Sequence, residues 1–263
     1  MELGLADRVV VVTGAGRGIG REVARSLLAE GARVVACART GADLEALRAE
    51  AGDPTSVLAV PIDVAEPGAP ARIATAAIGR FGRLDGLVNN AGGAVATRLD
   101  RMTDGLWRDA FEVDFFAAAR LSVAVIDPMR RAGWGRIVNV ASTYGREPDP
   151  AFAAYGAAKA ALINLTKSFA RAYAADGINT NCVVPGVTLT EGVLSSAAHA
   201  AERSGSTVAQ VMKTTMANDP VAAGRFGQPE EVAGAISFLL SAQASWISGA
   251  CLAVDGSTLR VAP

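Results

Sequence analysis

The stretch VVVVTGAGRGIGREVARSLL, Val9–Leu28, decides the fold class of this chain. Its β-branched run predicts a buried strand, and the segment from Gly18 onward predicts a helix. The glycines between them follow the pattern G-x-x-x-G-x-G, which lets the backbone approach a phosphate at the N-terminus of the helix. No Gly-Lys-Ser/Thr follows, so the loop favours dinucleotide binding over a P-loop NTPase. The candidate contacts are Gly14, Gly16, Arg17, Gly18, Ile19 and Gly20.

Short β-branched runs alternate with Ala- and Leu-rich helical segments along almost the whole chain. This alternation predicts an α/β fold, a single-domain, Rossmann-like, doubly wound parallel sheet of about seven strands with helices on both faces. We expect that domain to span residues 1–263, with 190–227 as a substrate-binding lid because its helical pattern is patchy. The expected strands are Arg8–Thr13, Arg33–Ala38, Val57–Ile62, Gly86–Asn89, Gly135–Ala141, Ile178–Val184 and Ala250–Val254. The expected helices lie near Gly18–Glu30, Ala42–Ala51, Ala69–Phe81, Thr103–Arg131, Ala153–Ala175 and Pro229–Ser241.

The composition argues against several classes of function. The chain has 263 residues, 19% of them charged, and a formal net charge of -1, so no basic field attracts nucleic acid or a membrane surface. No apolar run reaches the roughly 18 residues of a membrane span, and no signal-peptide pattern is present. Cys37, Cys182 and Cys251 lack paired spacing, which indicates reduced thiols and a cytoplasmic location. With His199 as the only histidine, a protein-bound metal or a Ser-His triad is not expected.

The end of the second expected strand bears on which dinucleotide binds. NAD-binding domains usually place a carboxylate there for the adenosine ribose, whereas this chain has Ala38 and then Arg39. Arg39 and Arg17 can hold a 2′-phosphate through charge-assisted hydrogen bonds. In the alternative interpretation Arg39 is a solvated loop cation and Arg17 packs over the adenine. We expect NADP(H) to be favoured over NAD(H).

A candidate catalytic pair lies in AFAAYGAAKAALINLTKSFARAYA, Ala151–Ala174. Tyr155 and Lys159 are about one helical turn apart, so both side chains leave the same face. The ammonium would stabilise a phenolate beside it, which suits a general acid or base. Ser142, after an apolar strand, is placed to hydrogen-bond the same substrate oxygen. The spacing by itself is more typical of a surface helix, and it is the rest of the chain that favours catalysis.

The motifs of this chain, taken in order, resemble those of the short-chain dehydrogenase/reductase family, in particular its 3-oxoacyl-ACP reductase-like members. The resemblance covers the chain from Leu5 to Ser257. It implies an NAD(P)-dependent oxidoreductase acting on a ketone or a secondary alcohol. The motifs are TGAGRGIG (Thr13–Gly20), DV (Asp63, Val64), NNAG (Asn89–Gly92), Ser142, YGAAK (Tyr155–Lys159), PG (Pro185, Gly186) and VDG (Val254–Gly256).

The resemblance also implies a role for each matching residue. Tyr155 would give a proton to the carbonyl oxygen in reduction and act as base in oxidation, Ser142 would polarise that oxygen, and Lys159 would bind the nicotinamide ribose. Asp63 would bond the adenine amino group beside the backbone of Val64. The remaining implied cofactor contacts are Asn90, Ala91, Gly92, Pro185, Gly186, Thr188 and Thr190.

One position departs from the family pattern. In WRDAFEVDFFAAARL, Asp114 stands where the family usually has a catalytic Asn that shapes a helix kink and holds a water through its backbone. An Asp keeps the backbone carbonyl but adds a negative charge near Lys159, which would weaken the pull of the ammonium on Tyr155. The alternative is a tolerated variant whose backbone does the same work. Because its charge would act on Lys159 and Tyr155, Asp114 is a catalytic candidate.

The residues around the expected active site say less about the substrate. Thr143, Tyr144, Phe152 and Val187 are candidate pocket walls, and their mostly apolar character suits a hydrophobic or acyl-chain ketone rather than a sugar. Family members commonly form tetramers. The Ala-rich helices of this chain permit such a homo-oligomer, although they serve equally well for packing within one subunit.

Other functions remain open beside an NADP(H)-dependent carbonyl reductase. Asp114 suggests a catalytically altered cofactor-binding protein, which the retention of Ser142, Tyr155 and Lys159 opposes. An NAD-dependent alcohol dehydrogenase acting in the oxidative direction is a further alternative, because the sequence does not encode direction. An enoyl reductase is disfavoured, since such relatives usually separate the tyrosine and the lysine by more residues.

Overall fold

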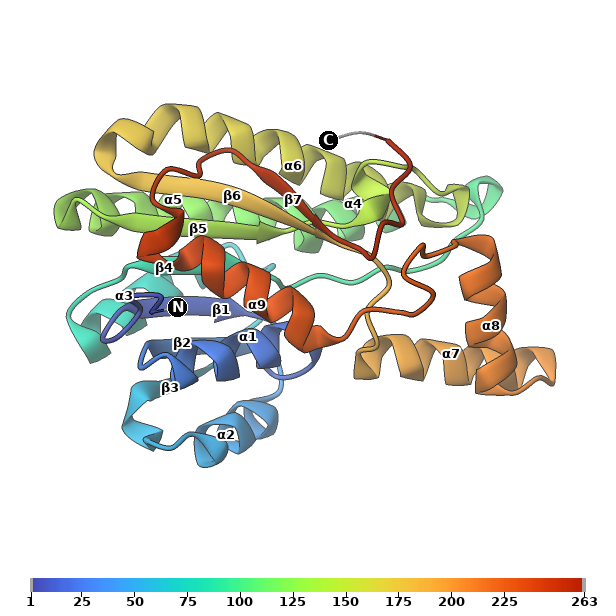
Figure 1. The fold of residues 1–263 in the computed structure, drawn as a ribbon, viewed down its shortest axis with the longest axis horizontal. Helices are drawn as coiled ribbons and strands as arrows, with labels where there is room; N and C mark the ends of the chain where they lie inside the picture. The colour runs from blue at the N-terminus through green and yellow to red at the C-terminus, as the bar shows by residue number, and fades with distance from the viewer. Residues whose placement is uncertain (1, 262–263) are drawn as a thin grey trace.

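The computed structural model describes residues 2–261, which form one domain around a parallel sheet (Figure 1). Met1 and residues 262–263 of the expected domain lie outside the described residues. The strand order β3-β2-β1-β4-β5-β6-β7 places a topological switch point between β1 and β4. The strands are β1 (Val9–Thr13), β2 (Arg33–Ala38), β3 (Val57–Pro61), β4 (Gly86–Asn89), β5 (Gly135–Val140), β6 (Ile178–Pro185) and β7 (Cys251–Val254).

Helices cover both faces of this sheet (Figure 1). α1, α2 and α9 pack on one face, and α3, α5 and α6 pack on the other. α7 and α8 lie beside the sheet rather than over it (Figure 1). The helices are α1 (Gly18–Ala29), α2 (Gly41–Glu50), α3 (Ala69–Phe81), α4 (Asp104–Phe111), the π-helical turn η3 (Glu112–Phe116), α5 (Ala117–Ala132), α6 (Ala153–Tyr173), α7 (Glu191–Ser204), α8 (Val208–Asn218) and α9 (Pro229–Leu240).

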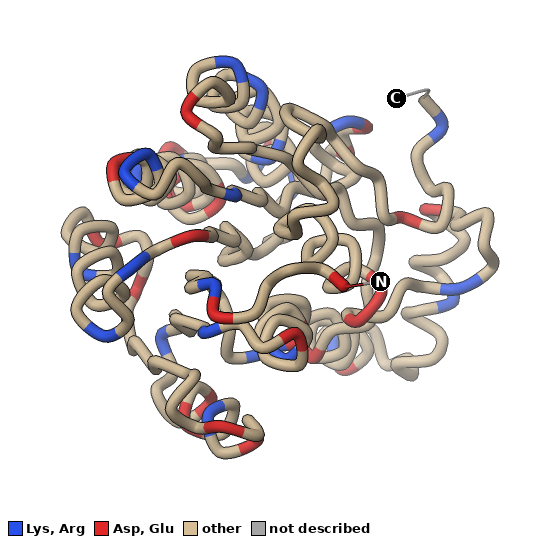
Figure 2. The backbone as a smooth tube through the Cα atoms, turned by 60° about the vertical axis from the view of Figure 1, so that its left-hand side comes forward, with Lys and Arg blue, Asp and Glu red and all other residues tan. Residues whose placement is uncertain are grey.

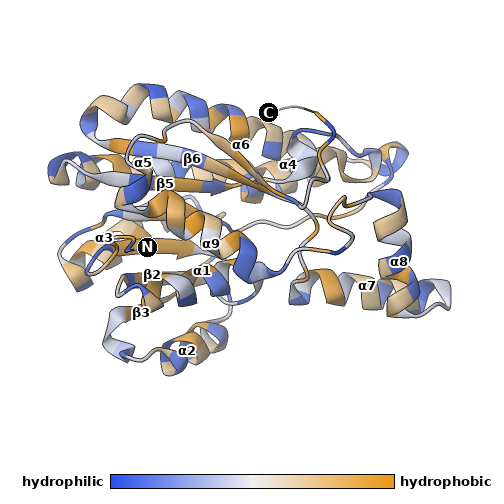
Figure 3. Cartoon of the chain, in the orientation of Figure 1, coloured by the Kyte–Doolittle hydropathy of each residue, from blue (hydrophilic) through white to orange (hydrophobic). Residues whose placement is uncertain are grey.

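The hydrophobic core has two halves because consecutive strand residues point to opposite faces of the sheet. Val10 and Val12 of β1 join the cluster formed with α1 and α9, whereas Val9 and Val11 join the cluster formed with α3 and α5. All five residues of β1 are buried, which explains why the strand reads as an unbroken apolar run. Hydrophobic colouring accordingly concentrates on the central strands and α9 (Figure 3).

Charged residues of both signs are interspersed over the outer helices and loops (Figure 2). Many of them pair on the surface, as Arg21 does with Glu50 and Arg225 with Glu231. Within the part of the chain that the structure describes, no helix is long and apolar enough to cross a membrane.

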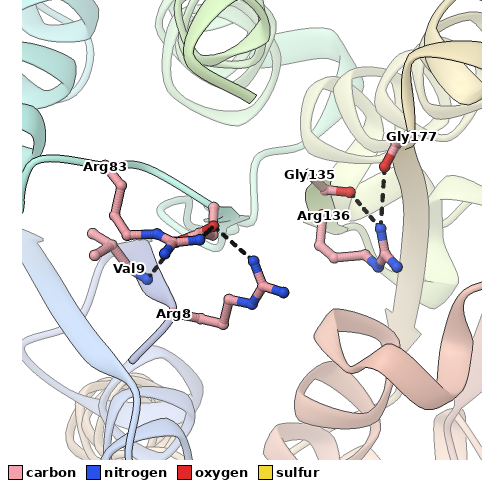
Figure 4. Close-up of polar contacts among 7 residues, drawn as sticks. Arg8, Val9, Arg83, Gly135, Arg136 and Gly177 are labelled. Atoms are coloured by element: carbon pink, nitrogen blue, oxygen red, sulfur yellow. Dashed lines mark hydrogen bonds and ion pairs between the residues drawn. The ribbon is translucent and has the colours of Figure 1, made fainter. Parts of the chain in front are cut away.

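The buried carboxylate of Asp85 is hydrogen-bonded to residues of two strand starts at the amino end of the sheet (Figure 4). Asp85, just before β4, is fully buried and accepts a hydrogen bond from the backbone N–H of Val9 at 2.9 Å. Arg83 donates to both carboxylate oxygens at 2.6 and 2.7 Å, and Arg8 adds a third side-chain contact at 3.1 Å. The carboxylate therefore fixes the starts of two adjacent central strands, β1 and β4.

Arg136 links β5 to the start of β6 at the same end of the sheet. Its Nη1 donates to the carbonyl oxygens of Gly135 at 2.8 Å and Gly177 at 3.3 Å (Figure 4). Trp134 packs against two guanidinium groups, at 4.0 Å from Arg8 and 4.4 Å from Arg136. Burial, and after it the charge of Arg8, lowers the pKa of Arg136 to about 10.

The expected strands and helices match the observed ones within two residues at each end, with two differences. The sequence predicts one helix over Thr103–Arg131, but the π-helical turn η3 interrupts it, because an i→i+5 turn is invisible to a 3.6-residue pattern. The stretch 190–227 contains two regular helices, α7 and α8, instead of a patchy one. Thr190 and Thr207 cap their N-termini, Thr207 in a complete capping box.

Candidate active site

The candidate residues gather at the carboxyl edge of the sheet. Because the strands are parallel, their carboxyl ends all meet at this edge. The glycine loop follows β1, and Asn90 follows β4 directly. Arg39 and Asp63 follow β2 and β3, whereas Ser142 follows β5 and Pro185 ends β6. The fold thus brings residues that follow six strands to the same end of the sheet.

Asn90 holds the glycine loop in place. Its Nδ2 donates to the carbonyl oxygen of Thr13 at 2.9 Å, and its own backbone N–H donates to Thr13 Oγ1 at 2.9 Å. Gly14 has a φ of 67°, in the left-handed region, and a side chain at Gly20 would overlap both the Gly14 carbonyl and the Asn90 amide. The loop is therefore packed tightly on one side, and α1 begins at its other side with Gly18.

Arg17 and Arg39 are exposed and belong to two neighbouring loops, the glycine loop and the loop after β2. A Cβ on Gly16 would lie 3.4 Å from the Ala38 side chain, so the glycine loop and the end of β2 are neighbours. Between residues 2 and 261, neither guanidinium has a hydrogen-bond or ion-pair partner. The sequence did not single out Asp43 of α2, whose Oδ2 would lie 3.3 Å from that same Cβ.

Two further groups of cofactor candidates flank the loop. Asp63 is half-buried and accepts a hydrogen bond from the backbone N–H of Ala65 at 2.9 Å. Val64 and Ala91 line a small hollow over β1 and β4. After Pro185, Thr188 is buried and donates to the Gly186 carbonyl oxygen at 3.1 Å, which folds this segment back on itself.

Glu191 reaches from the first turn of α7 to the glycine loop. Its Oε2 accepts a hydrogen bond from the Gly18 backbone N–H at 3.0 Å. Thr190 lies against the same glycine, because a Cβ there would be 3.1 Å from its methyl group. A carboxylate oxygen therefore occupies an anion position at the N-terminus of α1. Sequence reasoning named Thr190 but missed Glu191, since no local pattern links positions 173 residues apart.

Tyr155 and Lys159 share one face of α6, as their spacing predicts. The Lys159 ammonium is 5.5 Å from the centre of the Tyr155 ring and donates to the Val140 carbonyl oxygen at 3.0 Å. Lys159 is 3% exposed. Burial opposes its charge, but Tyr155 and Asp114 outweigh that effect, so the pKa of Lys159 is raised. Ser142 is buried at the end of β5, where its Oγ accepts the Tyr144 N–H at 3.3 Å.

Asp114 pairs directly with Lys159. It lies in the π-helical turn η3, and its Oδ1 is 3.2 Å from the Lys159 Nζ and 3.2 Å from the Gly93 backbone N–H that donates to it. A side chain at Gly92 would overlap the Asp114 carboxylate. Burial raises the pKa of Asp114, although Lys159 and the Gly93 N–H act in the opposite direction. π-Helical turns are frequent at functional sites, and this one aims a carboxylate at the lysine.

A buried polar network, which sequence reasoning did not find, anchors α6 to the sheet. Asn89 of β4 donates to Asn139 of β5 at 2.8 Å and to Ser122 of α5 at 3.0 Å. Asn139 in turn donates to Thr166 of α6 at 2.8 Å. Asn139 thus ties α6, the helix that carries Tyr155, to the sheet, and Asn89 holds Asn139 in place; Asn139 would lose a buried partner if the helix moved.

The four substrate candidates fall into two places. Tyr144 and Phe152 stack on each other, with ring centres 4.8 Å apart and planes 14° apart, and Thr143 is buried beside them in the turn after Ser142. Val187 instead lines a cavity of about 310 Å³ between the ends of β6 and β7 and the start of α9. None of the other three candidates lines that cavity.

Comparison with known proteins identifies the family of this chain. A profile of the short chain dehydrogenase family matches residues 8–201. The 3-oxoacyl-[acyl-carrier-protein] reductase FabG of Vibrio cholerae is 37% identical over 259 residues, covering 98% of this chain and 100% of its own length. Cis-4-hydroxycyclohexanecarboxylate dehydrogenase of Sinomonas cyclohexanicum is 41% identical over 260 residues, covering 97% and 98%.

A solved structure extends the similarity to three dimensions. The crystal structure of L-sorbose reductase from Gluconobacter frateurii, complexed with NADPH and L-sorbose, superimposes with a TM-score of 0.93. The two chains are 31% identical, and the match covers 100% of each. The chain described here therefore belongs to the short-chain dehydrogenase family, as an oxidoreductase that transfers a hydride between a nicotinamide cofactor and a ketone or secondary alcohol.

Proposed function

We propose that this chain reduces a ketone with NADPH, and oxidises the corresponding alcohol in reverse, with Tyr155 as the proton-transferring group. The observation that carries the proposal is the buried Lys159 ammonium, 5.5 Å from the Tyr155 ring at the edge of the sheet where the glycine loop lies. The bound nicotinamide supplies the hydride, and the protein supplies orientation and the proton.

Each catalytic candidate has a distinct task in this proposal. Ser142 holds and polarises the carbonyl oxygen, and the Tyr155 hydroxyl gives that oxygen its proton. Lys159, held by the Val140 carbonyl, keeps a positive charge beside the tyrosine and so favours release of the proton. Asp114 partly offsets that charge through its ion pair with Lys159.

Two observations support a dinucleotide at this end of the sheet. The glycine loop has no space for side chains at Gly14 and Gly20, where it packs on Asn90 and Ala91, so its backbone can lie close to a ligand there. The Gly18 N–H already holds a carboxylate oxygen of Glu191, which is the kind of anion that a diphosphate would replace. The proposed contacts are Gly14, Gly16, Arg17, Gly18, Ile19, Gly20, Asp63, Val64, Asn90, Ala91, Gly92, Pro185, Gly186, Thr188 and Thr190, together with Tyr155 and Lys159.

The decisive experiment is the Tyr155→Phe variant, assayed with NADPH on a ketone that the wild type reduces. We expect kcat/KM to fall by about 10²–10⁴, the usual contribution of a positioned acid–base group, with NADPH affinity retained. Ser142→Ala should lose activity in the same assay. A Tyr155→Phe enzyme with wild-type kcat/KM would refute the assignment.

The preference for NADP(H) is supported by two unpaired cations, Arg39 and Arg17, beside the glycine loop. Asp43 acts against it, because its carboxylate lies near the same loop and would repel a 2′-phosphate. Two substitutions separate these influences. Arg39→Asp should lower the NADPH/NADH ratio of kcat/KM, and Asp43→Asn should raise it. A ratio that neither substitution changes would contradict a 2′-phosphate at this position.

For the substrate we propose a hydrophobic or alicyclic ketone. The stacked rings of Tyr144 and Phe152 offer a flat apolar wall next to Ser142. A relative named for a hydroxycyclohexanecarboxylate is 41% identical to this chain, and one named for an acyl-carrier-protein substrate is 37% identical. A panel of cyclohexanone derivatives, 3-oxoacyl thioesters and ketoses tests this class. Faster turnover of a ketose than of either other class would overturn it.

We also propose that the chain works as a homotetramer in the cytoplasm. Phe116 and Val123, from η3 and α5, are 42% and 63% exposed, and Trp246 is 99% exposed. Large apolar side chains of this kind commonly mark contacts between subunits. Three free thiols suit a reducing compartment. Light scattering after size-exclusion chromatography tests the assembly, and a monomeric mass would contradict it.

A further inference from the structure

Two cysteines face each other across the last two strands of the sheet. Cys182 of β6 and Cys251 of β7 are direct partners in the parallel register, and the Cys182 N–H donates to the Ala250 carbonyl oxygen at 2.9 Å. Side chains of register partners point to the same face of a sheet. Neighbouring strands lie about 4.8 Å apart, inside the range of Cα separations that a disulfide spans.

The two thiols differ in accessibility. Cys182 is completely buried, whereas Cys251 is partly exposed on the edge strand β7. Both pack in the apolar cluster of Ala141 and Val184. Cys37 is also buried, but it belongs to the separate cluster around β2. A small oxidant therefore reaches Cys251 first, and Cys182 is the thiol that stands behind it.

The pKa values of the two thiols differ in the same sense as their exposure. The hydrogen bond with Cys182 lowers the pKa of Cys251 to about 7, with burial opposing and the guanidinium of Arg146 assisting. The same hydrogen bond, followed by burial, raises the pKa of Cys182, while the nearby Lys159 ammonium opposes. Cys251 thus carries the thiolate, and Cys182 remains a thiol at its side.

We propose that Cys251 and Cys182 form a peroxide-reactive dithiol that reversibly closes to a disulfide. The Cys251 thiolate attacks hydrogen peroxide, so that an S–O bond forms as the O–O bond breaks and hydroxide leaves. Cys182 then attacks the sulfenic sulfur, the S–S bond forms, and the oxygen departs as water. In balance, two thiols and one peroxide give one disulfide and two waters.

The disulfide lies beside the catalytic machinery. β6 continues from Cys182 to Pro185 and Gly186, which are proposed to contact the cofactor, and the Lys159 ammonium acts electrostatically on the Cys182 thiol. A disulfide would fix β7 covalently to β6 at the register pair just before that segment and so restrict its movement. Oxidation therefore lowers oxidoreductase activity, and a dithiol reductant restores it.

The primary test is the intact mass of the wild-type protein after treatment with hydrogen peroxide under native conditions. We expect the loss of two hydrogens per chain, with Cys182 and Cys251 found in one cross-linked peptide, and reversal by dithiothreitol. Cys37→Ser is the matched control and should behave like the wild type. This readout needs no substrate, so it stands or fails independently of the proposed reaction.

Two single variants assign the roles. Cys182→Ser should stop at oxygen addition on Cys251, trapped by a sulfenic-acid reagent. Cys251→Ser, a substitution on the partly exposed edge strand, should leave Cys182 unmodified and its activity resistant to peroxide. A wild-type chain that shows no cross-link, or a Cys251→Ser chain that oxidises at Cys182 as fast as the wild type, overturns the proposal.

Discussion

Two buried carboxylates, Asp85 and Asp114, sit at opposite ends of the same sheet and are bonded very differently. Asp85 receives three contacts from two guanidinium donors, the shortest at 2.6 Å, and a backbone N–H at 2.9 Å (Figure 4). Asp114 has one ammonium and one backbone N–H, both at 3.2 Å. Both carboxylates are at most 2% exposed.

The difference distinguishes a structural ion pair, that of Asp85, from the ion pair of Asp114, which has fewer hydrogen bonds to its carboxylate. Asp85 has hydrogen-bond donors on both oxygens, and its carboxylate joins β1 to the segment before β4. Asp114 shares a single ammonium with the Val140 carbonyl and with Tyr155. Its pKa is raised by burial, which means that the folded state does not fully stabilise the charged form. With few hydrogen bonds to its carboxylate, Asp114 can gain or lose its proton more readily, which would change the net charge near Tyr155.

The largest effect is expected for Lys159→Met. Removing the ammonium leaves Asp114 buried without its cation, which typically destabilises by about 3–5 kcal/mol. It also removes the charge beside Tyr155, so kcat/KM should fall by about 10²–10⁴. Urea unfolding and steady-state kinetics measure the two losses. The double variant with Asp114→Asn should regain stability but no activity, and recovery of activity would argue against a catalytic role for Lys159.

The counterpart at the other end is Asp85→Asn. Replacing this carboxylate weakens three charge-assisted contacts and the bond from Val9, so we expect a loss of about 2–3 kcal/mol in the free energy of unfolding. kcat/KM per folded molecule should stay at the wild-type value, because Asp85 lies far along the sheet from the carboxyl edge. A changed kcat/KM per folded molecule would contradict a purely structural role for Asp85.

Asp114→Asn sharpens the comparison by changing only charge. With the acid removed, Lys159 acts undiminished on Tyr155, and the alkaline limb of the pH–rate profile should move to lower pH by on the order of one unit. Identical profiles for wild type and variant would show that the Asp114 charge does not reach the tyrosine.

The same substitution has a stability signature whose sign is fixed. Asp114 has a raised pKa in the folded state, so its contribution to stability is present below the unfolded value of about 3.9 and is lost as pH rises through the folded value. The amide does not titrate. The stability of Asp114→Asn relative to wild type should therefore increase with pH across the acid range, as urea unfolding at several pH values would detect. A difference independent of pH would contradict the raised pKa.

The smallest effect concerns a third carboxylate, Glu191, which within residues 2–261 accepts one hydrogen bond, from the Gly18 N–H. Glu191→Gln weakens this hydrogen bond by about 1 kcal/mol, so the cofactor should displace it more easily and bind about fivefold more tightly. Fluorescence titration with NADPH measures the dissociation constant. Glu202→Gln, at an exposed position on the same helix, is the matched control. Weaker binding in Glu191→Gln would mean that the carboxylate assists the cofactor.

The sequence predicted those parts of the molecule that depend on neighbours along the chain. The β-branched runs, the glycine loop and the Tyr155–Lys159 spacing are local patterns, and the strands and α6 form where those patterns indicate. The position of Asp114 near Lys159 was also expected, although from the resemblance and not from spacing.

What the sequence did not predict depends on contacts between distant segments. The bond from Gly18 to Glu191 joins the first helix to α7, and the pairing of Cys182 with Cys251 depends on the register of β6 and β7. The network of Asn89, Asn139 and Thr166 looks in sequence like polar interruptions in apolar strands and a helix. Such contacts are fixed by packing in three dimensions, which no local pattern encodes.

The contact between Glu191 and Gly18 has a consequence for the rate of turnover. In the proposed site a departing cofactor would not leave a bare N–H behind, because the Glu191 carboxylate on α7 would take its place. Dissociation then becomes an exchange of one anion for another, and its barrier is lower than that of a step that exposes an unpaired donor. Since release of product often limits enzymes with lids, Glu191 would in this proposal link the position of α7 to the rate at which the cofactor dissociates.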